Sequence, residues 1–379
     1  MLYLIFALSF AAGCAACTSE MDCALNGACV AGACRCASFW EGSDCSRVRF
    51  GRVPAATLGA LQPAADASHW CAGVLPDENG TWHAYSALMD KNCGLNAWQR
   101  NSIITHATGP SPTGPFAPES TVLSFFSHNP KPVRANDGTW LIFHIGCGAG
   151  TSPITTCTNG TTPISALIDF PSRGSAAAAP CTDYGTSVLS APSPSGPWTA
   201  ATVIAPAPSP SGFPRSADNP SALIFPNGST WVMFRSYNRT GKFHSVIGMA
   251  RAPHWSGPFT IDAEPLFPQW MEDPYLFYQP ETDSFHALFH TMGGCPQVGC
   301  HAFSKDGTAW RVSPGGAYNF TVALSSGATV ELKRRERPQL VYDPKTGKPT
   351  HLINGAEATQ HDGGQEDKTF SIIVPLAFA

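Results

Sequence analysis

The chain has 379 residues, a formal net charge of -4, and only 13% charged residues. This balance argues against nucleic acid or an acidic membrane surface as a partner, because both are bound through clustered positive charge. The 34 prolines are spread along the chain, and no long helical periodicity is present. Because proline breaks helices, we expect an all-β protein.

The chain begins with a short apolar stretch, residues 1–16, that ends in small residues. Such a stretch is typical of a secretory signal peptide that is cleaved near Ala15 or Ala16. A membrane anchor is the alternative, but the stretch is short for a bilayer span and no other long apolar stretch exists. We therefore expect a secreted or extracellular protein with no membrane span.

Six cysteines follow within residues 17–45, at Cys17, Cys23, Cys29, Cys34, Cys36 and Cys45. A segment of about 30 residues cannot build a sufficient apolar core, so disulfides must hold it. The spacing, with Cys34-Arg35-Cys36 and then Phe39-Trp40-Glu41-Gly42-Ser43-Asp44-Cys45, resembles an epidermal growth factor-like module. The resemblance implies the pairs Cys17–Cys29, Cys23–Cys34 and Cys36–Cys45, and a surface for a protein partner. Ala15-Ala16 precede Cys17 where the calcium-binding variant has acidic and amide residues, so we expect no calcium there.

After a predicted linker at residues 46–65, one strand-turn-strand phrase repeats five times within residues 66–379. Its second strand reads Gly80-Thr81-Trp82-His83-Ala84-Tyr85 and recurs at residues 138–143, 229–234, 283–289 and, in degenerate form, 347–353. Self-similarity built of short strands is typical of a β-propeller, with a two-sheet sandwich as the alternative. We expect five four-stranded blades, with Val133, Leu223, Leu276 and Leu340 on innermost strands.

Seven more cysteines lie in the propeller segment: Cys71, Cys93, Cys147, Cys157, Cys181, Cys295 and Cys300. Closeness in sequence predicts the pairs Cys71–Cys93 and Cys295–Cys300. Two of Cys147, Cys157 and Cys181 are expected to pair, which leaves one free thiol. A metal site is the rival interpretation, which the mixed spacing disfavours, so we expect no metal. Five Asn-x-Ser/Thr sites predict glycosylation at Asn79, Asn159, Asn227, Asn238 and Asn319.

The later copies of the phrase are preceded by a polar pair and a proline: His128-Asn129-Pro130, Asp218-Asn219-Pro220, Glu272-Asp273-Pro274 and Glu336-Arg337-Pro338. Innermost strands of a propeller begin around one mouth of its channel, so these side chains should converge. Crowded carboxylates shift one another's pKa values, so that one serves as acid while another stays ionised. Two carboxyls flanking a glycosidic bond are what its hydrolysis needs. The alternative is that these residues only cap turns.

A second phrase trails the units, as in Ser111-Pro112-Thr113-Gly114-Pro115-Phe116 and Ser193-Pro194-Ser195-Gly196-Pro197-Trp198. With five blades and Asp or Glu at the strand starts, the pattern resembles the five-bladed glycosidase superfamily, above all glycoside hydrolase family 43. The resemblance covers roughly residues 66–379. It implies cleavage of arabinosyl, xylosyl, galactosyl or fructosyl linkages by an Asp base, a tuning Asp and a Glu acid, with no cofactor.

Carried onto this chain, the resemblance implies Glu272 as the acid, with a raised pKa, and Asp218 as the tuning residue. The first blade has no Asp-Pro, and Asp66 is a poor substitute, so the base is expected to be Asp273 or Glu336. An inverting reaction would place the acid and the base about 6.5–9.5 Å apart.

We expect His128, Asn129, Asn219 and Arg337 to bind substrate. Trp70 and Trp270 either stack on sugar rings or belong to the core. The stretch 333–337 is either a salt-bridged strand edge or an anion clamp. Two functions are therefore open. The clustered carboxylates favour a glycosidase acting on extracellular carbohydrate, whereas the missing Asp-Pro of blade one favours a non-catalytic propeller that binds glycan or protein.

Overall fold

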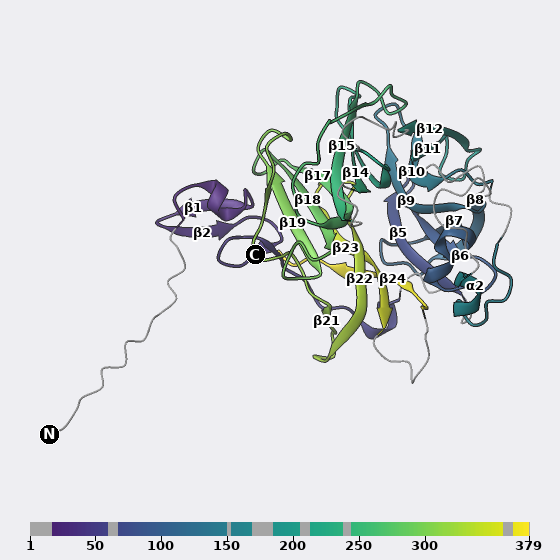
Figure 1. Cartoon of the computed structure of the whole chain (residues 1–379). Helices are drawn as coiled ribbons and strands as arrows, with labels where there is room; N and C mark the ends of the chain where they lie inside the picture. Colours follow the sequence, from purple (N-terminus) through teal and green to yellow (C-terminus); the bar gives the residue numbers. More distant parts are fainter. Residues whose placement is uncertain are drawn as a thin grey trace.

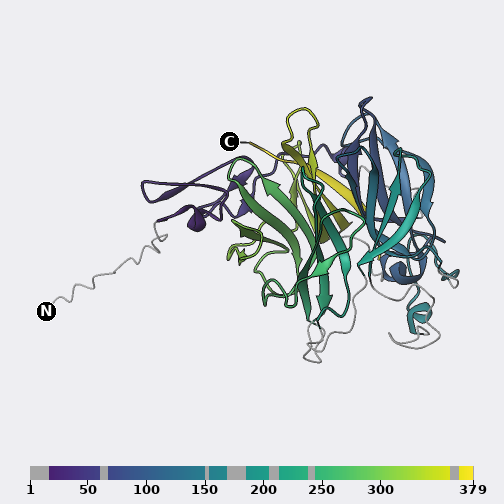
Figure 2. The same cartoon turned by 90° about the horizontal axis from the view of Figure 1, so that it is seen from above.

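The computed structural model describes residues 17–59, 67–149, 153–168, 185–204, 213–237, 244–358 and 367–378. Five four-stranded antiparallel sheets form the expected five-bladed propeller of an all-β protein (Figures 1 and 2). The expected signal segment, Asp66, Cys181 and Asn238 lie outside the described residues. No helix within the described ranges is both long and apolar enough to cross a membrane.

The blades follow one another along the chain, and the first strand of each of blades one to four contacts the innermost strands of its neighbours. Their bounds are β5 (Ser68–Pro76), β6 (Trp82–Met89), β7 (Ser102–Gly109) and β8 (Ala117–Leu123); β9 (Ser127–Arg134), β10 (Trp140–Gly146), β11 (Thr186–Ala191) and β12 (Thr199–Ile204); β13 (Asp218–Ile224), β14 (Thr230–Tyr237), β15 (Ser245–Ala252) and β16 (Thr260–Ile261); β17 (Met271–Gln279), β18 (Ser284–Thr291), β19 (Gly299–Ser304) and β20 (Arg311–Val312); and β21 (Thr321–Ala323), β22 (Thr329–Tyr342), β23 (Pro349–Ala358) and β24 (Phe370–Pro375). Short helices α1 (Trp98–Asn101) and α2 (Ile164–Ile168) lie in connections. Val133, Leu223, Leu276 and Leu340 lie on the innermost strands β9, β13, β17 and β22, as expected.

Every innermost strand carries a β-bulge near its channel-mouth end, with one residue in the left-handed conformation. The φ angle there is 55° at Asn129, 51° at Asn219, 53° at Asp273 and 49° at Arg337, and Cys71 of blade one has a φ of 32°. Asn and Asp tolerate this conformation, because their short polar side chains can bond locally. The bulge turns these five side chains toward one another across the channel.

The five bulge residues are joined by hydrogen bonds, and we call them the septum. Asn129 Nδ2 donates to Asn219 Oδ1 at 2.6 Å, and Asn219 Nδ2 donates to Asp273 Oδ1 at 2.7 Å. Arg337 Nη2 donates to the Asn129 carbonyl at 2.7 Å, and the Cys71 thiol donates to the Arg337 carbonyl at 3.0 Å. The septum therefore blocks the central channel and separates its two mouths.

The ring closes where blade five contacts β5 of blade one, and the segment that follows the six cysteines extends the edge of blade five. Phe50 forms a β-bridge with Leu376, and the Gly51 amide donates to the Pro375 carbonyl at 2.8 Å. Val53 is only 1% exposed and joins blade five. Residues 49–53, expected to belong to a linker, are thus part of the propeller, because their backbone groups complete the edge of its last sheet.

The cysteine-rich module, residues 17–48, packs beside blade four (Figures 1 and 2). It contains a short 3-10 turn and strands β1 (Gly27–Val30), β2 (Ala33–Cys36), β3 (Trp40–Glu41) and β4 (Arg47–Val48). Its disulfides join Cys17–Cys29, Cys23–Cys34 and Cys36–Cys45, the pairing that the resemblance implies. The fully buried Trp40 donates from Nε1 to Gln279 Oε1 at 2.9 Å, and its ring centroid lies 4.6 Å from that of His301. The module is therefore fixed to the propeller by core contacts.

The disulfides of the propeller differ in part from the prediction. Cys295–Cys300 forms as expected. Cys93 pairs with Cys157 and not with Cys71, because Cys71 lies in the septum and is a buried free thiol. Cys147 is also disulfide-bonded, so the free thiol of the described residues is Cys71, and neither Cys147 nor Cys157 is the free thiol expected among Cys147, Cys157 and Cys181. Four of the predicted glycosylation sites, Asn79, Asn159, Asn227 and Asn319, are exposed.

Candidate active site

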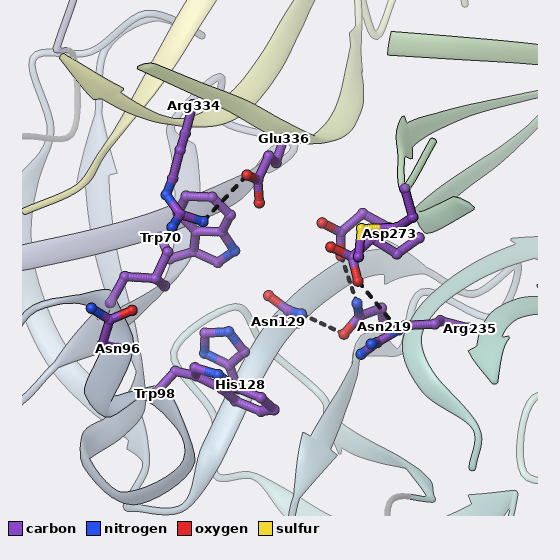
Figure 3. A pocket seen from close by; sticks show the side chains of 13 residues that line it. Trp70, Asn96, Trp98, His128, Asn129, Asn219, Arg235, Asp273, Arg334 and Glu336 are labelled. Carbon is purple, nitrogen blue, oxygen red and sulfur yellow. Dashed lines mark hydrogen bonds and ion pairs between the residues drawn. The ribbon is translucent and has the colours of Figure 1, made fainter. Parts of the chain in front are cut away.

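A pocket of about 330 Å³ lies at the mouth where the innermost strands begin (Figure 3). Seven residues predicted from the polar pairs and from blade one line it: Trp70, His128, Asn129, Asn219, Glu272, Asp273 and Glu336. Six more were not predicted: Leu95, Asn96, Trp98, Arg235, Met292 and Arg334. The strand starts therefore converge as the propeller architecture predicts.

Three carboxyl groups of this pocket gather around His290 of β18. His290 Nδ1 lies 3.2 Å from Glu272 Oε1, and its Nε2 lies 3.7 Å from Glu336 Oε1. One potential ligand atom from each of Glu272, Asp273, His290 and Glu336 lies within 4.8 Å of the others. Three carboxylates and one imidazole are a donor set that could hold a divalent cation, so the prediction of a metal-free site stays open to test.

The surroundings push the pKa values of the carboxyls apart. Burial raises the pKa of Glu272, but the hydrogen bond with His290 and the charge of Arg235 outweigh burial, so its pKa is lowered. Burial and the charge of Glu272 raise the pKa of Asp273 to about 6. Burial also raises the pKa of Glu336, against the attraction of His290. The expected raised pKa of Glu272 is therefore wrong: its pKa is lowered, whereas the pKa values of Asp273 and Glu336 are raised.

The imidazole between the two glutamates responds to both of them. Burial lowers the pKa of His290, but the hydrogen bond with Glu272 and the charge of Glu336 outweigh it, so the pKa is raised. His290 therefore tends to carry a proton between two acidic partners. This lets it exchange hydrogen bonds with either glutamate as charge moves between them.

Arg235 of β14 anchors Glu272 on the other side. Its Nε lies 3.2 Å from Glu272 Oε2 and donates to Ser245 Oγ at 2.9 Å. Its Nη1 lies 3.9 Å from Asp218 Oδ2. Asp218 is 2% exposed and does not line the pocket, so it acts on the pocket through Arg235.

Arg235 and His290 were missed, although each lies directly across a hairpin from a predicted residue. Asp218 pairs with Arg235, and Glu272 pairs with His290. Counting residues back from each hairpin turn gives the cross-strand partner of each predicted residue, and this count could have found Arg235 and His290. The bulge shifts the register by one residue before these pairs are reached, so a simple count points to the wrong neighbour.

Two tryptophans lie on one side of the pocket, apart from Asp273 and Arg235 (Figure 3). Trp70 is 3% exposed and packs closely on Gly355, so most of its ring belongs to the core. Trp98 is half-buried, with its ring centroid 5.0 Å from that of His128. Trp98 therefore offers more free aromatic surface for a sugar ring than the predicted Trp70 does.

Two predicted binding residues lie outside the pocket wall. The Trp270 ring is 40% exposed and stacks on His244 with centroids 3.6 Å apart. Arg337 is 2% exposed, and its Nη1 lies 3.4 Å from Asp273 Oδ1 in the septum. Arg337 therefore supports the floor of the pocket and does not line it.

The basic stretch 333–337 forms a salt-bridged part of β22. Arg334 Nε donates to Glu357 Oε2 at 2.8 Å, and its Nη1 lies 3.4 Å from Glu336 Oε1. Lys333 also pairs with Glu357, while Arg335 is buried on the opposite side. The strand-edge interpretation therefore describes this stretch, and among its arginines only Arg334 reaches the pocket wall.

None of the described blade-one residues that line the pocket carries a carboxylate. Cys71 occupies the septum position of this blade, and no Asp-Pro stands there. Burial raises the pKa of the Cys71 thiol to about 12, against the charge of Arg337. A thiol that stays protonated at neutral pH cannot serve as the missing base.

Solved structures share this fold. The chain is similar to a family 117 glycoside hydrolase of the marine bacterium Zobellia galactanivorans, with a TM-score of 0.55 and 14% identity over 89% of this chain and 90% of the other. The catalytic domain of the Coprinopsis cinerea GH62 α-L-arabinofuranosidase gives 0.54 and 12% over 87% and 97%. A Dyadobacter fermentans protein of unknown function gives 0.54 and 12% over 87% and 99%. No family model and no curated protein matches the chain. At these identities the likeness establishes the fold alone.

Proposed function

We propose that this protein hydrolyses glycosidic bonds of extracellular oligo- or polysaccharides in the pocket at the channel mouth. The observation that carries the proposal is the pair Glu272 and Glu336, which line one pocket with pKa values shifted in opposite directions. Glycosidases need one protonated and one ionised carboxyl beside the scissile bond. The fold shared with glycoside hydrolases supports the assignment. The disulfides fit an oxidising, extracellular compartment.

In the proposed reaction Glu336 donates its proton to the glycosidic oxygen. Glu272 attacks the anomeric carbon, and the bond to the leaving alcohol breaks. The Glu336 carboxylate then takes a proton from water, whose oxygen displaces Glu272 and releases the sugar. Arg235 orients Glu272, and His290 bridges the two glutamates and balances the charge as the proton moves.

The spacing of the carboxyls bears on the stereochemistry. The nearest oxygens of Glu272 and Glu336 lie within 4.8 Å. This is shorter than the ~6.5–9.5 Å of inverting enzymes and close to the ~5–5.5 Å of retaining ones. We therefore propose retention, in place of the inversion expected from the sequence. Proton NMR of the first product anomer distinguishes the two.

The experiment screens the secreted protein on aryl arabinosides, xylosides, galactosides and fructosides, and on plant and algal polysaccharides. On an active substrate we expect Glu336→Gln to lower kcat by roughly 10²–10⁴ with little change in ground-state binding. The matched control is Glu331→Gln, because Glu331 is an exposed glutamate of the same strand. Unchanged turnover of Glu336→Gln would exclude Glu336 as the acid, and loss of turnover in EDTA would place a cation among the carboxyls.

The second candidate function is a non-catalytic propeller that binds glycan. The septum cysteine favours it, because blade one has a buried neutral thiol and no carboxylate at this position. Calorimetry with the same polysaccharides separates the two functions. Binding without turnover by the wild type supports the second candidate, and turnover excludes it. A protein partner of the cysteine-rich module remains a prediction of the sequence.

A further inference from the structure

The septum closes off a second cavity, at the opposite mouth of the channel from the candidate active site. Its volume is about 350 Å³, and all five blades contribute to its wall from the far parts of their innermost strands. The lining is mainly apolar and aromatic, and includes Leu75, Ile224, Tyr275, Leu340 and Tyr342. Among the described residues that line it there is no carboxylate. Its chemistry is therefore the reverse of the acidic pocket on the other side of the septum.

A single buried amine projects into this second cavity. Lys131 of β9 is 7% exposed and lies two residues beyond the septum residue Asn129. Its Nζ stands 4.0 Å from the ring centroid of Tyr275, which lines the same cavity. Within the described part of the chain, Lys131 Nζ has neither a hydrogen-bond acceptor nor an ion-pair partner. Nζ is not among the polar atoms that are fully shielded from solvent, so it stays open to the cavity, where an ammonium with little hydration and no counter-charge is costly.

The charges near Lys131 add to this cost. Burial and the charge of Arg337 lower the pKa of Lys131 to about 7. Arg337 Nε is itself a buried donor without a hydrogen-bond acceptor among the described residues. Asp273 is bound within the septum by Asn219 and Arg337 and makes no ion pair with Lys131. Arg134, which also lines the cavity, is paired with Glu78, so Lys131 is the lining cation that has no counter-charge among the described residues.

We propose that the second cavity binds a small organic carboxylate with an apolar ring, whose carboxylate pairs with Lys131 Nζ. One cation at the inner end matches one anionic group, and the surrounding apolar side chains match an apolar body. A free sugar fits less well, because its hydroxyls would meet a wall that offers few polar partners. The site is separate from the acidic pocket and does not depend on whether that pocket is catalytic.

Binding should be coupled to proton uptake. A bound carboxylate favours the charged amine, so the lysine takes up a proton when the ligand binds near neutral pH. Affinity should therefore rise as the pH falls through 7 and should weaken above it. A neutral ligand of the same shape should show no such dependence.

The probes are benzoate and its neutral analogue benzyl alcohol, titrated by calorimetry into the full-length protein. We expect benzoate to bind, and Lys131→Met to weaken its affinity roughly 10–100-fold, because one charge-assisted contact is lost. The matched control Lys345→Met removes an exposed lysine from the turn of blade five and should bind like the wild type. Benzyl alcohol should bind wild type and Lys131→Met equally weakly.

Two further measurements keep the proposal falsifiable if Lys131→Met does not fold. The affinity of the wild type for benzoate is measured from pH 6 to pH 9, and an affinity that does not fall over this range overturns the proposal. A crystal soaked with 4-bromobenzoate locates bromine by anomalous scattering. A bromine peak beside Lys131 supports the site, whereas a peak only in the acidic pocket overturns the proposal. The proposal is also overturned if the wild type does not bind benzoate, or if Arg334→Met loses binding and Lys131→Met does not.

Discussion

We expect this protein to lose stability in mild acid, because blade four contains two buried histidines. The Nδ1 of His286 lies 3.0 Å from the Nε2 of His301, and the Nδ1 of His301 lies 2.8 Å from Ser313 Oγ. The Trp40 ring of the cysteine-rich module covers both imidazoles, and both are fully buried. Burial lowers the pKa of His301 to about 3, and burial together with His301 lowers that of His286 well below its usual value.

The sign and size of the effect follow from proton binding. An imidazole in the unfolded chain has a pKa of about 6.5. Above that pH, His301 is neutral in both states and contributes no pH dependence. Between pH 6.5 and about 3, the unfolded chain binds a proton that the folded protein does not, so the free energy of unfolding falls as the pH falls. The loss reaches about 1.4 kcal/mol per pH unit, or about 2 kcal/mol between pH 6.5 and 4.5 for His301 alone.

The variant His301→Gln keeps an amide that can bond Ser313 and removes the titrating group. Urea unfolding with disulfides intact gives the free energy of unfolding at pH 6.5 and at pH 4.5. We expect the loss between the two pH values to be smaller in the variant than in the wild type by about 2 kcal/mol, whatever its stability at pH 6.5. His254→Gln, which changes an exposed histidine, is the control and should titrate like the wild type. Equal pH dependence in His301→Gln and the wild type would refute the reasoning.

The remaining predictions concern buried groups and the proposed acid. Trp40→Ala should lower the free energy of unfolding by roughly 3–5 kcal/mol, because it empties a fully buried site between module and blade four, whereas Trp270→Ala at an exposed ring should cost under about 1 kcal/mol. Cys71 should resist iodoacetamide at pH 8 in the native protein and react in urea, because its thiol is buried with a pKa of about 12; rapid labelling of the native peptide by mass spectrometry would contradict this. The pH–rate profile should be bell-shaped, with the acid limb from Glu272 and the alkaline limb from Glu336, and Glu336→Gln should remove the alkaline limb.

The sequence alone determined the architecture and the position of the candidate site. The five repeats predicted five blades, since each phrase encodes one hairpin and its turn. A tight turn depends on the residues that form it, so the local sequence is enough to predict it. The polar pairs before proline predicted which residues would meet at one mouth, because every innermost strand of a propeller starts there. The resemblance of residues 17–45 to an epidermal growth factor-like module implied the three pairs within the module, and these pairs form.

Only the tertiary structure decided which neighbours complete the site and what charge each group carries. Arg235 and His290 lie on bulged hairpins, and Trp98 lies on the short helix α1 between two strands, so no sequence period marks them. The partner of Cys93 lies 64 residues away in sequence, and sequence separation says nothing of distance in space. The pKa of Glu272 is lowered, and the amine of Lys131 is left without a counter-charge, by groups from other strands and by burial. Electrostatic energies depend on distances and on exclusion of water, and both arise only when the blades close into a ring.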